Sequence, residues 1–430
     1  MSSPIISAGT NGDGAFPESS LGFSDGTFYG TAYEGGAWNA GTIFALSSDG
    51  VRFTNLHSFA LFSDDGNTPK SGVILAGGTL YGTAEYGGAS GQGTIFAVNT
   101  DGSGFTNFYN FTGGADGGYP ECLLAVAGNT LFGTTLRGGA AGYGVVFSVN
   151  TNGANFSTLH YFTGKGGDGA LPQSGVILAG GTLYGATLLG GASGSGMVYA
   201  VNTDSTWFTN LYSFTGGVDG AAPLASLKLI GNMLYGTASA GGSASNGVVF
   251  AVGTNGLGFT NLHSFAQTNG LLGVNADGAC PQASFSAAGG ILYGTTQLGG
   301  ATGNGTIFRI NADGSGFKKL YDFAAGVDGG SPEAGVILSG GSLYGTANKG
   351  GLAGNGVVFG LNIRPQVTLT ALPGSLVLTW PTNAGPFTLQ SCSNLTSAWY
   401  NMTNVSAQVG GQMSATDTFS ASQKFYRLIQ

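Results

Sequence analysis

The chain has 430 residues, of which 42% are hydrophobic and only 7% are charged, and its net charge is −8. Its Lys and Arg residues are scattered singly, so no basic patch is available and we expect no nucleic-acid partner. No stretch approaches the roughly 18 uninterrupted apolar residues of a membrane helix, which predicts no transmembrane segment. The 83 glycines together with the high apolar content favour short strands and tight turns over disorder.

One short motif recurs seven times along the chain: an apolar residue, an aromatic residue, glycine and usually threonine. Its copies are residues 28–31, 80–83, 131–134, 183–186, 234–237, 292–295 and 343–346. They follow one another at a spacing of about 51 residues, and only the step from Gly236 to Gly294 is longer. Repeats of this length are typical of solenoids, propellers and arrays, in which a single unit cannot bury its apolar face alone.

Within one repeat the sequence predicts four strands, at residues 123–126, 130–134, 144–149 and 156–162. Asn152 and Gly153 separate the last two, and this pair is typical of a tight hairpin turn. No window shows a helical period. Four antiparallel strands repeated seven times predict an all-β fold, a seven-bladed β-propeller. A β-solenoid is the alternative, although its coils are usually shorter and its sheets parallel.

The ends of the repeat region indicate how such a ring would close. The fourth-strand pattern Phe-x-x-Leu-x-x-Phe begins at residues 53, 105, 156, 208, 259 and 317, with Phe108 in place of Leu in the second copy, and it is absent after the third strand of the seventh repeat. Two periods before residues 108–111 of the second copy lie residues 5–8. We therefore expect an amino-terminal strand at residues 5–8 to complete the last blade.

The repeats resemble the GloVer tandem repeat of choice-of-anchor proteins. The resemblance covers residues 1–362 and depends on Leu-Tyr-Gly-Thr, the Gly-Gly loop, Gly-Thr-Ile-Phe and Asp-Gly-x-x-Pro in register. It implies a bacterial protein that is secreted or attached to the cell surface, and it implies no particular activity. Because the amino terminus lacks the features of a signal peptide, the expected extracellular or cell-surface location rests on resemblance alone.

Composition changes after residue 362, where glycine becomes rarer and the repeat motif stops. Residues 363–430 resemble a small carboxy-terminal β-sandwich domain of secreted bacterial proteins, similar to immunoglobulin or fibronectin domains. Strands are expected there at residues 367–369, 376–380, 387–390 and 425–428. The predicted organisation is therefore a propeller over residues 1–362 followed by this small domain.

Two sets of repeated polar residues are predicted to be structural. His57, His160 and His263 occupy one position of the fourth strand in three different repeats, so they cannot converge on a metal ion or a nucleophile. Asp-Gly-x-x-Pro turns begin at Asp13, Asp65, Asp116, Asp168, Asp219, Asp277 and Asp328. We expect these carboxylates to cap their own turns, with no cofactor and no metal site; calcium binding in the turns is the alternative.

Binding residues are expected where the repeats differ, namely directly after each turn proline and in the two residues before each Gly-Gly pair. Both sets should lie on one face. Tyr33, Trp38 and Tyr86, with Glu34 and Glu85 beside them, are candidate ligand-binding residues, because aromatic rings flanked by carboxylates suit sugars. The sequence thus predicts a non-catalytic extracellular or cell-surface protein that binds a polysaccharide or surface proteins.

Two other functions stay open. A carbohydrate-active enzyme, a glycosidase or a lyase, would use Glu18, Glu121 and Glu333 as acid and base or nucleophile near the mouth of the pore. A rigid spacer in a surface layer would need none of these residues. We expect no catalysis, and no catalytic residue is assigned for the favoured function.

Overall fold

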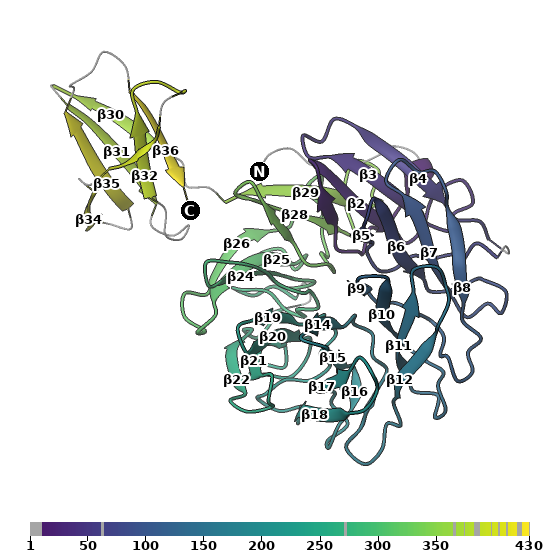
Figure 1. Ribbon diagram of the computed structural model, residues 1–430. Coiled ribbons are helices and arrows are strands. Elements are labelled where there is room, and N and C mark those ends of the chain that lie inside the picture. The colour runs from purple at the N-terminus through teal and green to yellow at the C-terminus, as the bar shows by residue number, and fades with distance from the viewer. Residues whose placement is uncertain are drawn as a thin grey trace. The chain divides into compact units, whose positions relative to one another are not determined.

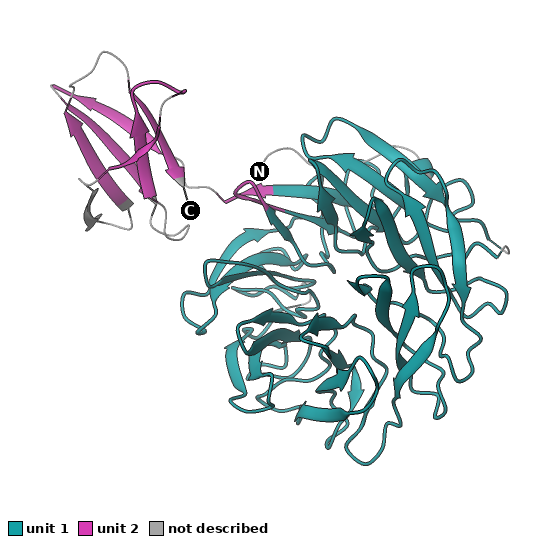
Figure 2. Cartoon of the chain, in the orientation of Figure 1, with its two compact units in different colours: residues 1–338, 344–360 teal, residues 339–343, 361–430 magenta. Residues whose placement is uncertain are grey.

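The computed structural model describes residues 11–61, 64–270, 273–363, 367–373, 375–381, 388–396, 398–402, 405–409, 412–418 and 424–429. The chain divides into two compact units, one of residues 1–338 and 344–360 and one of residues 339–343 and 361–430 (Figure 2). Over the described ranges the only helix is the short 3-10 helix η1 (Asn11–Asp13). None of the described helices could span a membrane. The predicted all-β class is confirmed.

We number the repeats one to seven by their motif glycines, Gly30, Gly82, Gly133, Gly185, Gly236, Gly294 and Gly345. Their strands in chain order are β1 (Gly22–Ser24), β2 (Thr27–Ala32), β3 (Thr42–Ser47), β4 (Phe53–Ser58), β5 (Ile74–Ala76), β6 (Thr79–Ala84), β7 (Thr94–Asn99), β8 (Thr106–Asn110), β9 (Ala125–Ala127), β10 (Thr130–Thr135), β11 (Val145–Asn150), β12 (Ser157–Tyr161), β13 (Gly169–Ala170), β14 (Ile177–Ala179), β15 (Thr182–Thr187), β16 (Leu189–Gly190), β17 (Met197–Asn202), β18 (Phe208–Ser213), β19 (Lys228–Ile230), β20 (Met233–Ala238), β21 (Val248–Gly253), β22 (Thr260–Ser264), β23 (Ser286–Ala288), β24 (Ile291–Thr296), β25 (Thr306–Asn311), β26 (Lys318–Asp322), β27 (Ile337–Ser339), β28 (Ser342–Ala347) and β29 (Val357–Asn362).

These strands form one antiparallel sheet per repeat. In the described residues six sheets have four strands and the seventh, β27-β28-β29, has three, while β13 and β16 form a separate pair. The sheets follow one another around a common centre, and the short first strands β5, β9, β14 and β19 lie nearest to it (Figure 1). This arrangement is β-propeller-like. The strand expected at residues 5–8 lies outside the described residues.

The glycine of the repeated motif is required by packing within its own sheet. A Cβ on Gly30 would lie 2.6 Å from Cζ of Phe44, and one on Gly82 would lie 2.4 Å from Cζ of Phe96. Both phenylalanines are almost completely buried on the neighbouring third strand. Any side chain at this position would displace the central ring of the sheet's core, so glycine recurs there.

The threonine of the motif connects each repeat to the next. Thr31 Oγ1 donates to the carbonyl oxygen of Ser71 at 2.8 Å, and Thr346 Oγ1 donates to that of Ser19 at 2.9 Å. The same bond joins Thr83 to Cys122, Thr134 to Ser174, Thr237 to Ala283 and Thr295 to Ala334. Repeat four carries Ala186 instead and has no hydroxyl to donate. One buried hydrogen bond therefore recurs between six pairs of repeats, the last and first included.

A second contact joins the same neighbours. The glycine that opens the third strand packs against the turn proline of the following repeat: a Cβ on Gly41 would lie 2.4 Å from Cδ of Pro69, and one on Gly356 would lie 2.5 Å from Cδ of Pro17. Beside it, Phe16 N donates to the carbonyl of Asn355 at 2.8 Å. Repeat seven thus contacts repeat one through the same groups that join the other repeats.

At the outer edge, aromatic rings of successive repeats stack on one another. His57 lies parallel to Phe105 with ring centroids 3.5 Å apart, and its Nε2 is 3.0 Å from Oδ2 of Asp65. The equivalent pairs are His160 with Phe208 and His263 with Phe317. The three histidines pack between repeats and bind turn aspartates, so their predicted structural role is confirmed.

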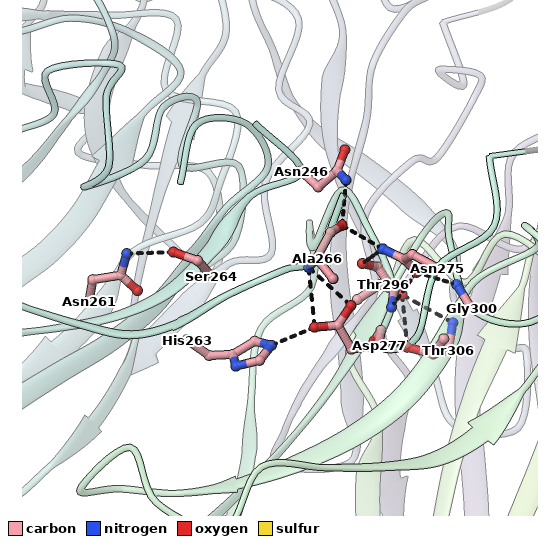
Figure 3. Close-up of polar contacts among 11 residues, drawn as sticks. Asn246, Asn261, His263, Ser264, Ala266, Asn275, Asp277, Thr296, Gly300 and Thr306 are labelled. Atoms are coloured by element: carbon pink, nitrogen blue, oxygen red, sulfur yellow. Dashed lines mark hydrogen bonds and ion pairs between the residues drawn. The ribbon is translucent and has the colours of Figure 1, made fainter. Parts of the chain in front are cut away.

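The turn aspartates accept hydrogen bonds from their own repeat junctions. Asp277 binds His263 Nε2 at 2.9 Å and the backbone N–H of Ala266, and Asn275 braces the same turn by donating to the carbonyl of Ala266 (Figure 3). Backbone N–H groups likewise donate to Asp65, Asp116, Asp168, Asp219 and Asp328. The capping prediction is confirmed for these six. The fourth-strand partner expected for Asp13 would fall outside the described residues.

The smaller unit contains two antiparallel sheets. Its strands are β30 (Thr368–Leu372), β31 (Ser375–Pro381), β32 (Thr388–Cys392), β33 (Tyr400–Asn401), β34 (Val405–Val409), β35 (Gln412–Thr418) and β36 (Phe425–Ile429). They pair in the orders β30-β31-β35-β34 and β33-β32-β36. Leu378 and Trp380 from the first sheet and Leu389 from the second share one hydrophobic cluster. The structure has a strand at each of the four places expected from the sequence. Phe387, expected to begin one of these strands, lies outside the described residues.

We predict that Thr346→Val destabilises the larger unit by about 1–3 kcal/mol, because the buried carbonyl of Ser19 loses its donor while the side-chain volume is preserved. Thr106→Val is the matched control: Thr106 is exposed on a strand, and its substitution should change stability by less than about 0.5 kcal/mol. Denaturant unfolding curves of both variants test this. Equal stability of the two variants would contradict a structural role for the bond.

Candidate functional site

The candidate site begins with a left-handed residue in front of each turn proline. Seven non-glycine residues there have φ between 52° and 57°: Phe16, Thr68, Tyr119, Leu171, Ala222, Cys280 and Ser331. This conformation costs on the order of 1–2 kcal/mol for an L-residue. Because the strain recurs in every repeat, the surrounding structure must hold these residues in place.

Two backbone hydrogen bonds hold each left-handed residue. Its N–H donates to the preceding repeat, as Phe16 does to Asn355, and its carbonyl accepts from the first residue of the variable pair. Tyr33 N donates to Phe16 O at 3.1 Å, and Asn348 N donates to Ser331 O at 3.3 Å. The residue after the proline is thereby placed beside the first residue of the pair. The side chains of Gln282 and Gln297 are accordingly hydrogen-bonded at 2.5 Å, which confirms that both variable sets share one face.

All seven repeats line one central cavity of about 150 Å³. Each repeat contributes the residues that follow its turn proline, and the first of these are Glu18, Lys70, Glu121, Gln173, Leu224, Gln282 and Glu333. The three carboxylates expected at the pore mouth, Glu18, Glu121 and Glu333, thus lie in a single cavity. Lys70 belongs to it as well.

Amide side chains fix the carboxylates on one side of the cavity. Glu333 Oε1 accepts from Gln297 Nε2 at 2.8 Å and from Asn348 Nδ2 at 3.3 Å. The same Asn348 nitrogen donates to Glu18 Oε1 at 2.7 Å. Because one nitrogen reaches both, Glu18 and Glu333 face each other across Asn348.

Glu121 has a different set of partners. Its Oε2 is 3.0 Å from Lys70 Nζ and accepts from Gln173 Nε2 at 2.8 Å, and its side chain is only 4% exposed. Glu85, which is itself buried, hydrogen-bonds to Glu121 and also accepts from Tyr86. Lys70 therefore neutralises Glu121, and Glu85 joins the network through its contact with Glu121.

Burial and the charges of neighbouring carboxylates raise the pKa of two carboxyl groups of the site, those of Glu18 and Glu85. Burial, followed by the charge of Glu333, raises the pKa of Glu18 to about 7, although Lys70 and Asn348 act in the opposite direction. Burial and then the charge of Glu121 also raise the pKa of Glu85. The hydrogen bond to Glu85, followed by burial, raises the pKa of Tyr86 to about 12. Carboxyls of this kind exchange protons near neutral pH.

Leucine side chains occur on the side of the mouth that is formed by repeats three, four and five. Leu136 and Leu188 occupy the positions at which other repeats carry Glu85 and Asn348, and both are half-buried. Leu224 lines the cavity in repeat five. Glu121 and Gln173 come from repeats three and four, so this side combines leucine side chains with polar groups, whereas the side formed by repeats six, seven and one is acidic and rich in amides.

Of the candidate aromatic residues, two adjoin the carboxyl groups of this site. Tyr33 occupies the position of the variable pair that Asn348 and Glu85 occupy in their repeats, and burial and then the charge of Glu85 raise its pKa. Tyr86 is 40% exposed and meets Tyr119 edge to face with ring centroids 5.5 Å apart. Trp38 is 63% exposed, and none of the described ring contacts includes it.

Glu34 is positioned by its backbone, which pairs with Ala15 in an antiparallel bridge. The sequence alone did not single out Lys70, Tyr119 or Asn348 as site residues. The available signal was variability at aligned positions: Lys70 stands where other repeats carry Glu, Gln or Leu, and Asn348 stands where others carry Tyr, Glu or Leu. Among the described residues, no three His, Cys, Asp or Glu side chains are grouped so that they could hold a metal ion.

The fold and the shared cavity define a β-propeller-like repeat protein with a polar central site. The sequence profile of the Gloeobacter/Verrucomicrobia repeat matches residues 3–184 and 271–373, and the chain belongs to this family. No curated protein matches the chain.

Several solved structures are similar in fold. A puromycin hydrolase aligns with a TM-score of 0.51 and 10% identity, over 89% of this chain and 62% of its own length. An oligogalacturonate lyase from Vibrio parahaemolyticus aligns with a TM-score of 0.49 and 9% identity, over 82% of this chain and 90% of its own. At these identities the likeness concerns the fold alone.

The strain at the left-handed residues can be measured. We predict that Ser331→Gly is more stable than Ser331→Val by about 1–2 kcal/mol, because only glycine adopts this conformation without steric cost. Ser148, in strand β11, provides the control with the opposite order, since valine is favoured over glycine in a strand. If valine and glycine are equally stable at position 331, the residue is not strained.

The raised carboxyl pKa values predict that stability falls as pH rises from about 4.5 to above 7. In this window the folded protein keeps a proton on Glu18 that the unfolded chain has already released, so folding is favoured at the lower pH. Glu18→Gln should flatten the dependence of melting temperature on pH, whereas Thr106→Val, a control that removes no titratable group, should follow the wild type. Parallel curves for wild type and Glu18→Gln would contradict the assignment.

Proposed function

We propose that this chain is a non-catalytic binding protein that binds glycans on the face that carries the central cavity. The observation that supports the proposal is the placement of Tyr33 and Tyr86 beside fixed carboxylates and amides at one side of the mouth. Sugars present apolar ring faces, which stack on aromatic rings, and hydroxyls, which bond to polar groups held in place. A cavity lined by seven repeats supplies both kinds of contact in one place.

Three further proposals accompany this function. The seven repeat sheets are the blades of one closed propeller, supported by the contacts of Thr346 with Ser19 and of Gly356 with Pro17. The two sheets of the smaller unit form a sandwich around the cluster of Leu378, Trp380 and Leu389. An extracellular or cell-surface location, with surface polysaccharide or proteins as partners, is proposed from the resemblance of the repeats.

A glycan-array screen of the full chain, followed by titration with the best ligand, tests the binding proposal. We expect Trp38→Ala and Tyr86→Ala each to weaken binding by roughly 1–3 kcal/mol, the transfer free energy of a buried aromatic side chain. Both residues are exposed, so stability should change by no more than about 0.5 kcal/mol.

The control is the motif tyrosine of repeat five. Tyr235 is 6% exposed and packs in a hydrophobic cluster, so Tyr235→Ala should lower stability by about 3–5 kcal/mol. A confirmed glycan affinity that survives both Trp38→Ala and Tyr86→Ala would place the binding surface elsewhere. Absence of any glycan ligand would leave the spacer function as the better explanation.

A carbohydrate-active enzyme is the second candidate, favoured by one observation. Glu18, with its pKa near 7, faces Glu333 across Asn348, and such pairs can act as acid and base. Incubation of the array ligand with the protein, followed by product analysis, separates the two functions. Cleavage that is lost in Glu18→Gln and Glu333→Gln would establish the enzyme, whereas an intact ligand supports the binding protein.

A further inference from the structure

The charges that line the central cavity do not balance. Three carboxylates, Glu18, Glu121 and Glu333, face it with a single ammonium group, that of Lys70. Lys70 is paired with Glu121 at 3.0 Å. Glu18 and Glu333 are bound by amide groups, which donate hydrogen bonds but carry no charge. The side of the cavity between repeats seven and one therefore holds two carboxyl groups that are not paired with a cation.

This pair also has unused hydrogen-bonding capacity. In the part of the chain that the structure describes, Glu18 and Glu333 accept hydrogen bonds only at Oε1, so Oε2 of both is available to a ligand. The Asn348 amide already shows that one nitrogen can donate to both carboxylates. A protonated amine has three donors and a full positive charge, so it would supply what the protein lacks at this place.

The surroundings of Glu18 favour a bound cation. The pKa of Glu18 is raised to about 7, first by burial and then by the charge of Glu333, which means that its ionised form is destabilised at this place. A neighbouring cation would stabilise that form. Within the same ring of side chains, Lys70 already forms an ion pair of this kind with Glu121.

The rest of the cavity limits the size and character of the ligand. A volume of about 150 Å³ corresponds to roughly five water molecules, enough for an amino group and part of a small body. Ser174 lines the cavity, is only 5% exposed, and its Oγ has no hydrogen-bond partner among the described residues. Leu224 contributes an apolar wall. A body that carries both hydroxyls and apolar C–H surface matches this lining.

We infer that the central cavity binds the protonated amino group of a small hydroxylated ligand, an amino sugar, between Glu18 and Glu333. The carbohydrate part of this inference rests on the proposed glycan-binding function, whereas the preference for a cation follows from the cavity alone. Among the described residues no three His, Cys, Asp or Glu side chains are grouped so that they could hold a metal ion, and the inference concerns an organic cation.

Calorimetric titration of the full chain at neutral pH and low salt tests the inference with four probes: D-glucosamine, N-acetyl-D-glucosamine, D-glucose and putrescine. The first two sugars differ in the charge on nitrogen, and putrescine carries the charge without the sugar. We expect D-glucosamine to bind at least tenfold more tightly than either neutral sugar, with an affinity that falls as salt is added.

Variants locate the site. Glu18→Gln and Glu333→Gln preserve shape and should each weaken D-glucosamine binding at least tenfold without affecting the neutral sugars. Asp101→Asn, the control at an exposed carboxylate that does not line the cavity, should leave it unchanged. Lys70→Gln removes the internal cation and should strengthen D-glucosamine binding several-fold; if this variant does not fold, the two Glu→Gln variants still decide the question.

The outcomes separate this inference from the function on which it partly rests. Equal affinity for the three sugars, or wild-type affinity in Glu18→Gln, overturns the inference and leaves glycan binding standing. Binding of putrescine but not of D-glucosamine, lost in Glu18→Gln, supports the cation site and overturns the sugar component. Failure of all four probes to bind overturns the inference, while the array screen decides independently on glycan binding.

Discussion

The structure depends on the hydrogen bonds and packing contacts that join each repeat to the next. A motif threonine donates into the following repeat, a third-strand glycine receives the following proline, and the residue before that proline donates back across the junction. A four-stranded sheet of this size cannot bury both faces alone, so the junction is what makes the repeats one folded unit.

The same junction creates the candidate site. Its left-handed residue turns the chain so that the side chain after the proline points to the shared cavity, next to the first residue of the variable pair. The scaffold is repeated, and the side chains on it are not. Glu18, Lys70 and Glu333 occupy equivalent places, yet they differ in charge. A ring of identical backbone positions can thus present carboxylates, amides, an ammonium group and a leucine around one cavity.

The departures from the repeat are informative for the same reason. Ala186 lacks the hydroxyl that connects the other repeats, and Tyr199 stands in the same repeat where most others have a buried phenylalanine, with a hydroxyl that has no partner among the described residues. The junction between repeats five and six is longer than the others, yet Asp277 still caps its turn. Asn275 supplies additional hydrogen bonds within the inserted residues. Repeat proteins tolerate such changes when the contacts between neighbours are kept.

The sequence by itself determined the number and length of the repeats, the four strands of six of them, the aspartate caps of six turns and the outer position of the histidines. These are local consequences of strand patterning and turn chemistry, and each is present in several aligned copies. It also indicated Glu18, Glu121 and Glu333 as one group, because variable positions of a closed array fall on one face. Only the tertiary structure decided that Lys70 pairs with Glu121, that Asn348 joins Glu18 to Glu333, and that Tyr33 and Tyr86, but not Trp38, adjoin the cavity network. Such pairings depend on distances between side chains that lie up to 330 residues apart, and no local pattern encodes them.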